Sequence, residues 1–229
     1  MDALFIKLGE AYSGYTIDGN VIEAAAGTPL GTMARASVKA GLRGLEWAAG
    51  IPGSVGGGIA MNAGAYGGEM KQVLKSVRLL KNGVIFEHPV ADEDMGYRRS
   101  AFSFPNAIAL GGRFELEFDD GSAMELMKEY SRMRRSKQPL ELPSAGSTFK
   151  RPEGHFAAKL IEDAGLKGFR VGNAMVSEKH AGFIVNMGGA GFGDVITLIE
   201  TVQQRVFDEF NVKLEPEVKI ITEKSLADR

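Results

Sequence analysis

The run of nineteen residues from Gly50 to Gly68 constrains the fold more than any other part of this chain. Eight of the nineteen are glycine, so most side-chain bulk is absent and backbone N–H groups can approach a ligand closely. A flexible linker would be rich in serine and other polar residues, whereas this run carries apolar side chains such as Ile51, Val55 and Ile59. The run therefore predicts a binding cradle, or a set of tight turns, inside a folded domain.

Two common kinds of cradle are excluded by the spacing of the glycines. No window of the sequence matches Gly-x-Gly-x-x-Gly, and no Gly-Lys step is followed by serine or threonine. A Rossmann fingerprint needs the first pattern and a P-loop needs the second. A ligand site in this run is therefore of another kind.

Composition narrows the class of ligand. The chain has 229 residues, of which 44% are hydrophobic and 24% charged, as in ordinary soluble globular proteins. The 27 basic residues nearly balance the 29 acidic ones, which argues against a nucleic-acid-binding face or a membrane-surface role. We find no cysteine, no cleavable apolar leader and no apolar run that could span a bilayer. These features predict a cytoplasmic protein that acts on a small molecule.

Periodicity predicts short strands and helices in alternation, hence an α+β fold. Asn82-Gly83 is the strongest hairpin signal, and Thr28 with Pro29 predicts the start of a helix that ends at Gly41. The expected strands are 4–7, 15–17, 21–24, 77–80, 84–87, 114–118, 182–186 and 217–222. Further helices are expected from Ser122 to Lys137, from Phe156 to Gly165 and after Asp194 to Phe210. Pro139 predicts a boundary between a domain at 1–138 and a smaller α+β domain at 139–229, which includes the C-terminal strand.

A second cluster with chemical potential spans Pro143 to Pro152. Gly146 permits a sharp turn that could project Ser147, and Lys150 with Arg151 offers cations to an anionic ligand. An ordinary turn before a helix would look similar. Likewise, the step Tyr97-Arg98 and the two carboxylates of 214–221 would each, alone, fit a surface ion pair.

Taken in order, these segments resemble the UDP-N-acetylenolpyruvoylglucosamine reductase family, also called UDP-N-acetylmuramate dehydrogenases. The resemblance runs from about Phe5 to Ile221. It is carried by Gly44–Gly53, Asn62–Gly67, Tyr97-Arg98, Ala145–Lys150, Leu166–Gly168, Val176–Asn186 and Leu214–Val218. It implies an FAD-binding α+β region of the vanillyl-alcohol-oxidase type followed by a substrate-binding domain. Another FAD oxidase of that superfamily is disfavoured by the serine turn and the carboxylate-bearing segment.

The resemblance also implies an activity. Members of the family use NADPH to reduce FAD and then reduce UDP-N-acetylglucosamine enolpyruvate to UDP-N-acetylmuramate, in peptidoglycan precursor synthesis. By position, Arg98, Ser147 and Glu217 would be catalytic, and no metal is expected. The flavin would be lined by Ile51, Gly53, Ser54, Gly56, Gly57, Asn62 and Gly64. Substrate or nicotinamide contacts would come from Tyr97, Lys150, Arg151, Lys167 and His180, although His180 could equally be a structural histidine.

One departure from the family pattern leaves two functions open. Family members carry, ahead of this region, a loop with the sequence Gly-x-Gly-Ser-Asn that holds the FAD pyrophosphate, and no Gly-Ser-Asn tripeptide occurs here. The FAD-binding region is therefore expected to be N-terminally truncated. The chain is either a working flavin-dependent reductase or a non-catalytic fragment that binds UDP-sugar without retaining FAD, because lost contacts to a diphosphate weaken binding.

Overall fold

The computed structural model describes residues 6–103 and 107–222. The chain divides into two compact units, and the boundary in the sequence falls between Met133 and Arg134, inside helix α3 (Ala123–Lys137). The boundary expected from the sequence, at residue 139, lies just beyond the end of this helix. Each unit has its own hydrophobic core and is described by itself.

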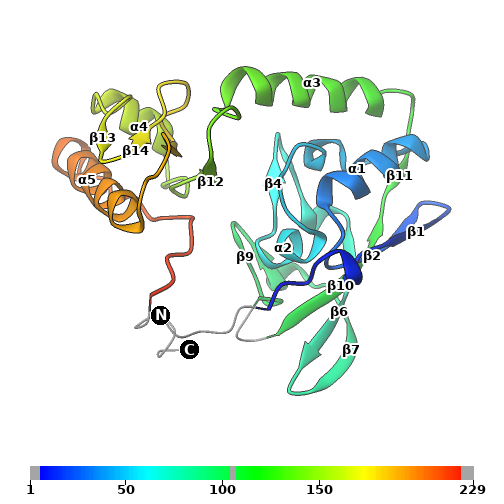
Figure 1. Cartoon of the computed structure of the whole chain (residues 1–229). Coiled ribbons are helices and arrows are strands. Elements are labelled where there is room, and N and C mark those ends of the chain that lie inside the picture. Colours follow the sequence, from blue (N-terminus) through cyan, green and yellow to red (C-terminus); the bar gives the residue numbers. More distant parts are fainter. Residues whose placement is uncertain (1–5, 104–106, 223–229) are drawn as a thin grey trace. The chain divides into compact units, whose positions relative to one another are not determined.

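The first unit is built on a five-stranded antiparallel sheet in the order β1-β2-β10-β6-β7 (Figure 1). Its strands are β1 (Tyr15–Asp18), β2 (Val21–Ala25), β6 (Leu74–Lys81), β7 (Val84–Pro89) and β10 (Ile108–Glu115). The hairpin expected at Asn82-Gly83 is confirmed: both residues have positive φ, as a two-residue turn between twisted strands requires. Strand β10 bulges between Ala109 and Gly111, so Ala26 pairs with the carbonyl of Leu110 in the bulge.

Helices α1 (Leu30–Lys39) and α2 (Val55–Ala60) supply the apolar partners of this sheet. Met33 and Ile59 are fully buried in one cluster with Ile22 and Phe114 from the sheet. The helix expected between Pro29 and Gly41 is confirmed. Its start differs, because Pro29 is the residue before the helix and the hydroxyl of Thr28 bonds to Gly14 instead of capping.

Short elements complete the first unit. The β4–β5 and β8–β9 pairs are both two-residue hairpins that follow α2 in the chain. The strands are β3 (Leu42–Arg43), β4 (Gly64–Ala65), β5 (Gly68–Glu69), β8 (Met95–Gly96), β9 (Arg99–Ser100) and β11 (Glu117–Phe118). The 3-10 turns are η1 (Glu10–Tyr12), η2 (Glu46–Ala48), η3 (Met70–Gln72) and η4 (Asp92–Asp94).

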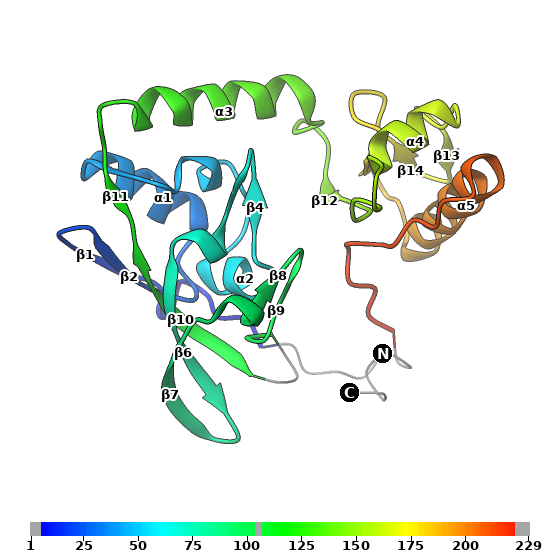
Figure 2. The ribbon, with the colours of Figure 1, turned by 180° about the vertical axis from the view of Figure 1, so that it is seen from behind.

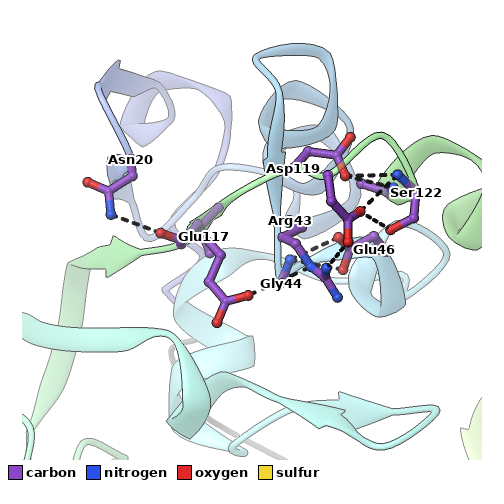
Figure 3. A network of polar contacts seen from close by, with 10 residues as sticks. Asn20, Arg43, Gly44, Glu46, Glu117, Asp119 and Ser122 are labelled. Atoms are coloured by element: carbon purple, nitrogen blue, oxygen red, sulfur yellow. Dashed lines mark hydrogen bonds and ion pairs between the residues drawn. The ribbon is translucent and has the colours of Figure 1, made fainter.

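A polar network fixes the segment that leads into α3 (Figure 3). Strand β11 pairs with β3, and Arg43 forms ion pairs with Asp120 at 2.7 Å and with Glu117 at 3.7 Å. Hydrogen bonds from Ser122, and then the nearby Arg43 charge, lower the pKa of the exposed Asp120 carboxyl. The carboxylate of Asp119 accepts the amide protons of Ser122 and Ala123, which satisfies the first donors of the helix.

The second unit is a four-stranded antiparallel sheet in the order β12-β15-β14-β13 with two helices (Figure 2). Its strands are β12 (Ser144–Ser147), β13 (Arg170–Val171), β14 (Ala174–Val176) and β15 (Phe183–Asn186), and its helices are α4 (Ala157–Asp163) and α5 (Phe192–Phe210). Helix α5 buries Leu198, Val202 and Val206 along one stripe. Asp194, expected to precede this helix, lies in its first turn and bonds back to the amide of Gly191.

Three expectations about strands are corrected by the structure. The C-terminal segment 217–222 forms no strand: its pairing with residues 148–150 is limited to the bridge between Pro216 and Phe149 and the two hydrogen bonds that flank it. The expected strand 114–118 is divided between the end of β10 and the two-residue β11, which lies outside the large sheet and leaves Phe118 70% exposed. Of the expected strand 4–7, residues 4 and 5 lie outside the described part, and residues 6 and 7 are in no regular element.

Within the described residues, we find no helix that is both long and apolar enough to cross a membrane.

Candidate functional site

The first half of the glycine run borders a cavity of about 600 Å³ in the first unit. Small-molecule sites typically measure about 300–1,000 Å³. Four of the seven predicted cofactor residues lie together in its wall, namely Gly53, Ser54, Gly56 and Gly57. Ser54 is the N-cap of α2 and accepts the amide proton of Gly57 at 3.2 Å, so the fold of the run itself shapes this wall.

Packing explains some glycines of the run. A Cβ atom at Gly56 would lie 2.8 Å from the Cβ of Ala26, and one at Gly68 would lie 2.1 Å from Cδ1 of Trp47. Real Cβ atoms essentially never come so close to a neighbour. These positions are therefore glycine because neighbouring elements pack against the bare backbone.

Two other glycines have no such explanation. A Cβ at Gly53 would meet nothing within 4 Å, and one at Gly57 would meet only the Ser54 hydroxyl at 3.5 Å. Neither residue has the positive φ that favours glycine. Both border the cavity, so their missing side chains keep its wall open for a group that lies close to the backbone. The wall fits a flat cofactor such as a flavin.

The remaining three predicted cofactor residues are placed differently. Ile51 packs against the hydrophobic core, Asn62 is 1% exposed, and Gly64 pairs with Glu69 in the β4–β5 hairpin. None of the three belongs to the cavity wall described above. Their contact with a cofactor stays a prediction.

Sequence reasoning missed most of the other residues that line this cavity. They belong to segments far apart in the chain: 7–10, 26–27, 102–103 and 107–109. Gly27 is explained by packing, since a Cβ there would lie 2.3 Å from the carbonyl oxygen of Tyr12. Pairing of β2 with β10 brings residues 26–27 close to 107–109, and no local pattern in the sequence specifies that pairing.

Arg98 occupies the turn of the β8–β9 hairpin. It has φ of 54°, in the left-handed region that non-glycine residues rarely adopt. Such a conformation costs on the order of 1–3 kcal/mol and persists only where the surroundings enforce it. Its Nη2 donates to the carbonyl of Gly64 at 3.3 Å, and its guanidinium lies 5.2 Å from the ring centre of the half-exposed Tyr97. The predicted pair Tyr97-Arg98 therefore forms one structured turn.

Ser147 ends strand β12 in the second unit. Gly146 takes the positive φ of 86°, and Ser147 follows it with an exposed side chain. The next residue, Thr148, is buried; its amide bonds to the carbonyl of Gly182, and its hydroxyl accepts the amide proton of Ile184 at 3.1 Å. These hydrogen bonds thus fix the backbone directly after Ser147.

Glu217 lies beside the same segment. Its amide donates to the carbonyl of Thr148 at 2.8 Å, and the amide of Lys150 donates to the carbonyl of Glu215 at 2.8 Å. These two bonds flank the bridge between Phe149 and Pro216. The structure therefore brings the stretches that carry Ser147 and Glu217 into direct contact, although they are seventy positions apart in the chain.

The predicted cations near this turn have intramolecular partners. Lys150 pairs with the carboxylate of Glu215. Arg151 donates from Nε to the carbonyl of His155 at 3.3 Å and lies over the ring of Phe156, 3.9 Å from its centre. Binding a diphosphate through these residues would exchange such contacts for charge-assisted bonds.

Lys167 follows helix α4 and His180 precedes strand β15, both in the second unit. Lys167 pairs with Glu162 at 2.8 Å. Burial lowers the pKa of His180, and the nearby charge of Lys167 lowers it further. The Nδ1 atom of His180 accepts the amide proton of Gly182 at 3.1 Å, and its ring lies edge-on to Phe183. The imidazole is therefore neutral near pH 7, with its proton on Nε2.

Comparisons with known proteins match two separate stretches of the chain to family models. Residues 2–86 match the model of a family described as FAD binding domain, and residues 138–221 match that of the UDP-N-acetylenolpyruvoylglucosamine reductase C-terminal domain. The α+β fold is thus that of an FAD-binding region followed by this C-terminal domain.

Similarity to individual proteins identifies the family. A UDP-N-acetylenolpyruvoylglucosamine reductase of Clostridium botulinum strain Hall is 49% identical over 223 residues, which are 96% of this chain and 72% of that protein. One from Alkaliphilus oremlandii is 47% identical over 98% of this chain and 74% of that protein. The crystal structure of UDP-N-acetylenolpyruvylglucosamine reductase from Thermus caldophilus superposes with a TM-score of 0.80 at 36% identity, over 93% of this chain and 76% of that one. This chain belongs to the UDP-N-acetylenolpyruvoylglucosamine reductase family.

Proposed function

We propose that this chain reduces UDP-N-acetylglucosamine enolpyruvate to UDP-N-acetylmuramate, with FAD as cofactor and NADPH as reductant. The observation that supports it best is the pairing of the Ser147 turn with the segment of Glu217, in the region that matches the reductase C-terminal domain. In a cell, the reaction would serve peptidoglycan precursor synthesis in the cytoplasm.

The proposed cofactor site uses the wall formed by Gly53, Ser54, Gly56 and Gly57. FAD, when bound and reduced by NADPH, supplies a hydride. The bare backbone at Gly53 and Gly57 would allow the flavin to lie directly against the chain. A polar cap at Ser54 holds the first turn of α2 in place behind it.

Arg98 is proposed to stabilise charge on the substrate. Hydride addition to the terminal carbon of an enolpyruvyl group leaves negative charge on the adjacent carbon, delocalised into the carboxylate. A guanidinium can hold that carboxylate through two charge-assisted hydrogen bonds, and it stays charged at any working pH. Tyr97, exposed in the same turn, is proposed to contact the substrate as well.

Ser147 is proposed as the proton donor. Its hydroxyl would protonate the carbon that bears the negative charge, which completes the addition of one hydride and one proton across the double bond. A serine is a weak acid, but an enolate next to a carboxylate is a strong base, so the transfer runs downhill. The exposed side chain, next to the backbone fixed by the bonds of Thr148, suits this task.

Glu217 is proposed to be protonated during turnover or to hold a water or Arg98. An ionised carboxylate would repel the substrate carboxylate, so the neutral form is the better neighbour. Lys150, Arg151, Lys167 and His180 are proposed to contact the UDP-sugar or the nicotinamide. The neutral imidazole of His180 would serve as a hydrogen-bond donor there.

The test is flavin retention followed by turnover. The purified chain is loaded with FAD and passed through gel filtration; we expect flavin to remain, NADPH to bleach it and UDP-N-acetylglucosamine enolpyruvate to restore its absorbance. Gly57→Ala should reduce flavin retention without loss of folding, because its Cβ has room in the protein alone. Loss of all flavin, with the substrate still raising the melting temperature, would instead establish a UDP-sugar-binding fragment.

A further inference from the structure

The segment 60–64 and the β8–β9 hairpin are joined by a regular set of hydrogen bonds. Each bond uses an alternate residue of the segment and a different residue of the hairpin. The bonds run from Ser100 Oγ to the Ala60 carbonyl at 3.0 Å, from Asn62 Nδ2 to the Gly96 carbonyl at 3.1 Å, and from Arg98 Nη2 to the Gly64 carbonyl at 3.3 Å. The turn that carries Arg98 is therefore anchored to the end of the glycine run.

Asn62 is the central anchor. Its side chain is buried, and its amide makes three hydrogen bonds. Nδ2 donates to Glu69 Oε2 at 3.0 Å and to the Gly96 carbonyl, while Oδ1 accepts the amide proton of Lys71 at 3.0 Å. One side chain thus links the β4–β5 hairpin, the turn η3 and the β8–β9 hairpin.

Local conformation alone does not account for this asparagine. Asn62 has φ of 42° just after α2, and asparagine is a common non-glycine residue in that conformation. Asn211 occupies the same kind of position after α5, with φ of 56°, and is exposed. A left-handed helix end therefore needs no buried bridge, so the three bonds of Asn62 call for a second explanation.

We propose that Asn62 is a positioning residue for Arg98, which rests on the catalytic role proposed for that arginine. The bond from Asn62 to Gly96 fixes the first strand of the hairpin directly before the turn. Arg98 holds a strained φ, so its turn keeps this conformation only while its flanks are fixed. Ala60 borders the cavity and accepts the Ser100 hydroxyl, so the same segment sets the cofactor wall and the arginine turn.

The first test compares Asn62→Gly with Asn211→Gly. Both substitutions keep the left-handed backbone conformation, but only the first removes a buried bridge. For Asn62→Gly we expect amide hydrogen exchange in residues 95–101 to rise at least about tenfold, with β10 and α5 unchanged. We also expect kcat/KM, measured per bound flavin, to fall about 100-fold, since a displacement of about 1 Å can cost that much. Asn211→Gly should change neither quantity.

The second test separates the two bonds made by Nδ2. Asn62→Asp removes the donor and places a carboxylate against Glu69. The double variant Asn62→Asp/Glu69→Gln restores a donor and an acceptor between these two residues, but leaves an oxygen facing the Gly96 carbonyl. We expect it to recover the melting temperature lost in Asn62→Asp and to leave kcat/KM low.

Each contrary result has a defined meaning. Unchanged exchange at 95–101 in Asn62→Gly would overturn the proposal, as would recovery of turnover in the double variant, because the contact with Glu69 would then suffice. Raised exchange with undiminished turnover would overturn the positioning role and leave the proposed function intact. If the parent chain with FAD shows no turnover, the proposed function fails, and the exchange data still decide whether Asn62 fixes the hairpin.

Discussion

The turns that carry Arg98 and Ser147 each contain a residue in the left-handed conformation, but different interactions hold these residues. In the second unit, Gly146 takes the left-handed conformation and Ser147 follows in an ordinary strand. In the first unit, Arg98 itself takes that conformation and hydrogen bonds from a distant segment surround it. The left-handed residue of the serine turn is thus a glycine, which adopts this conformation without strain, whereas that of the arginine turn is held by tertiary contacts. Substitutions that separate local from tertiary causes test this difference.

The largest effect is expected from Ser147→Ala. Loss of the proposed proton donor should lower kcat about 10²- to 10⁴-fold, while the free energy of unfolding changes by less than about 0.5 kcal/mol because the side chain is exposed. Stopped-flow absorbance measures both half-reactions, and reduction by NADPH serves as the internal control. A slow reductive half-reaction would instead assign the serine to cofactor or nicotinamide binding.

The second-largest effect on turnover is expected from Arg98→Lys. Lysine keeps the charge but loses the planar fork, so kcat/KM should fall about 10- to 100-fold, the worth of one charge-assisted hydrogen bond. Steady-state kinetics at saturating NADPH measures it. A loss no larger than that of Arg99→Lys, its exposed neighbour in β9, would remove the special role of Arg98.

Gly146→Ala should act mainly on stability. An alanine at φ of 86° is strained, at a cost of about 1–2 kcal/mol. Gly193→Ala is the matched control: Gly193 lies in the first turn of α5, a Cβ there meets nothing within 4 Å, and alanine should gain up to about 1 kcal/mol. Urea unfolding measures both. Equal effects would show that the glycine in the serine turn is not required by its backbone.

The smallest effect concerns pH. The pKa of His180 is lowered in the folded state, so the unfolded chain binds its proton more readily. This group therefore stabilises the fold above about pH 6.5, the usual histidine value, and the contribution is lost as pH falls below it. Between pH 7 and 5.5, the melting temperature should drop less in His180→Gln than in the parent. The same substitution at the exposed His155 provides the comparison, and identical slopes for all three proteins would contradict the linkage.

Features encoded locally were predictable from the sequence. Asn82-Gly83 predicted a hairpin because both residues tolerate positive φ, and the apolar stripe of Val195, Ile199, Val202, Val206 and Phe210 predicted a helix because its period matches 3.6 residues. The strand expected at 217–222 failed for a reason outside its own pattern. Its alternation fits a strand, but the pairing that the structure describes here is a bridge between Phe149 and Pro216, the residue just before the segment.

The candidate site divides in the same way. Residue types and order sufficed to predict Tyr97, Arg98, Ser147 and Glu217, and to connect the chain with its family. They did not reveal which glycines face open space, because that depends on neighbours such as Ala26 and Trp47 from other elements. Nor did they reveal the bridging role of Asn62, which requires Gly96 and Glu69 to lie on either side of it.

The sequence by itself determined the secondary structure of the longer elements, the residue types of the site and the family, because these follow from short-range periodicity, turn chemistry and the order of motifs. The tertiary structure alone decided that Gly53 and Gly57 border a cavity, that the stretches of Ser147 and Glu217 pair, and that Asn62 anchors the Arg98 turn. The reason is that hydrogen bonds and packing between residues far apart in the chain exist only after the strands have paired, and no local pattern specifies which strands will do so.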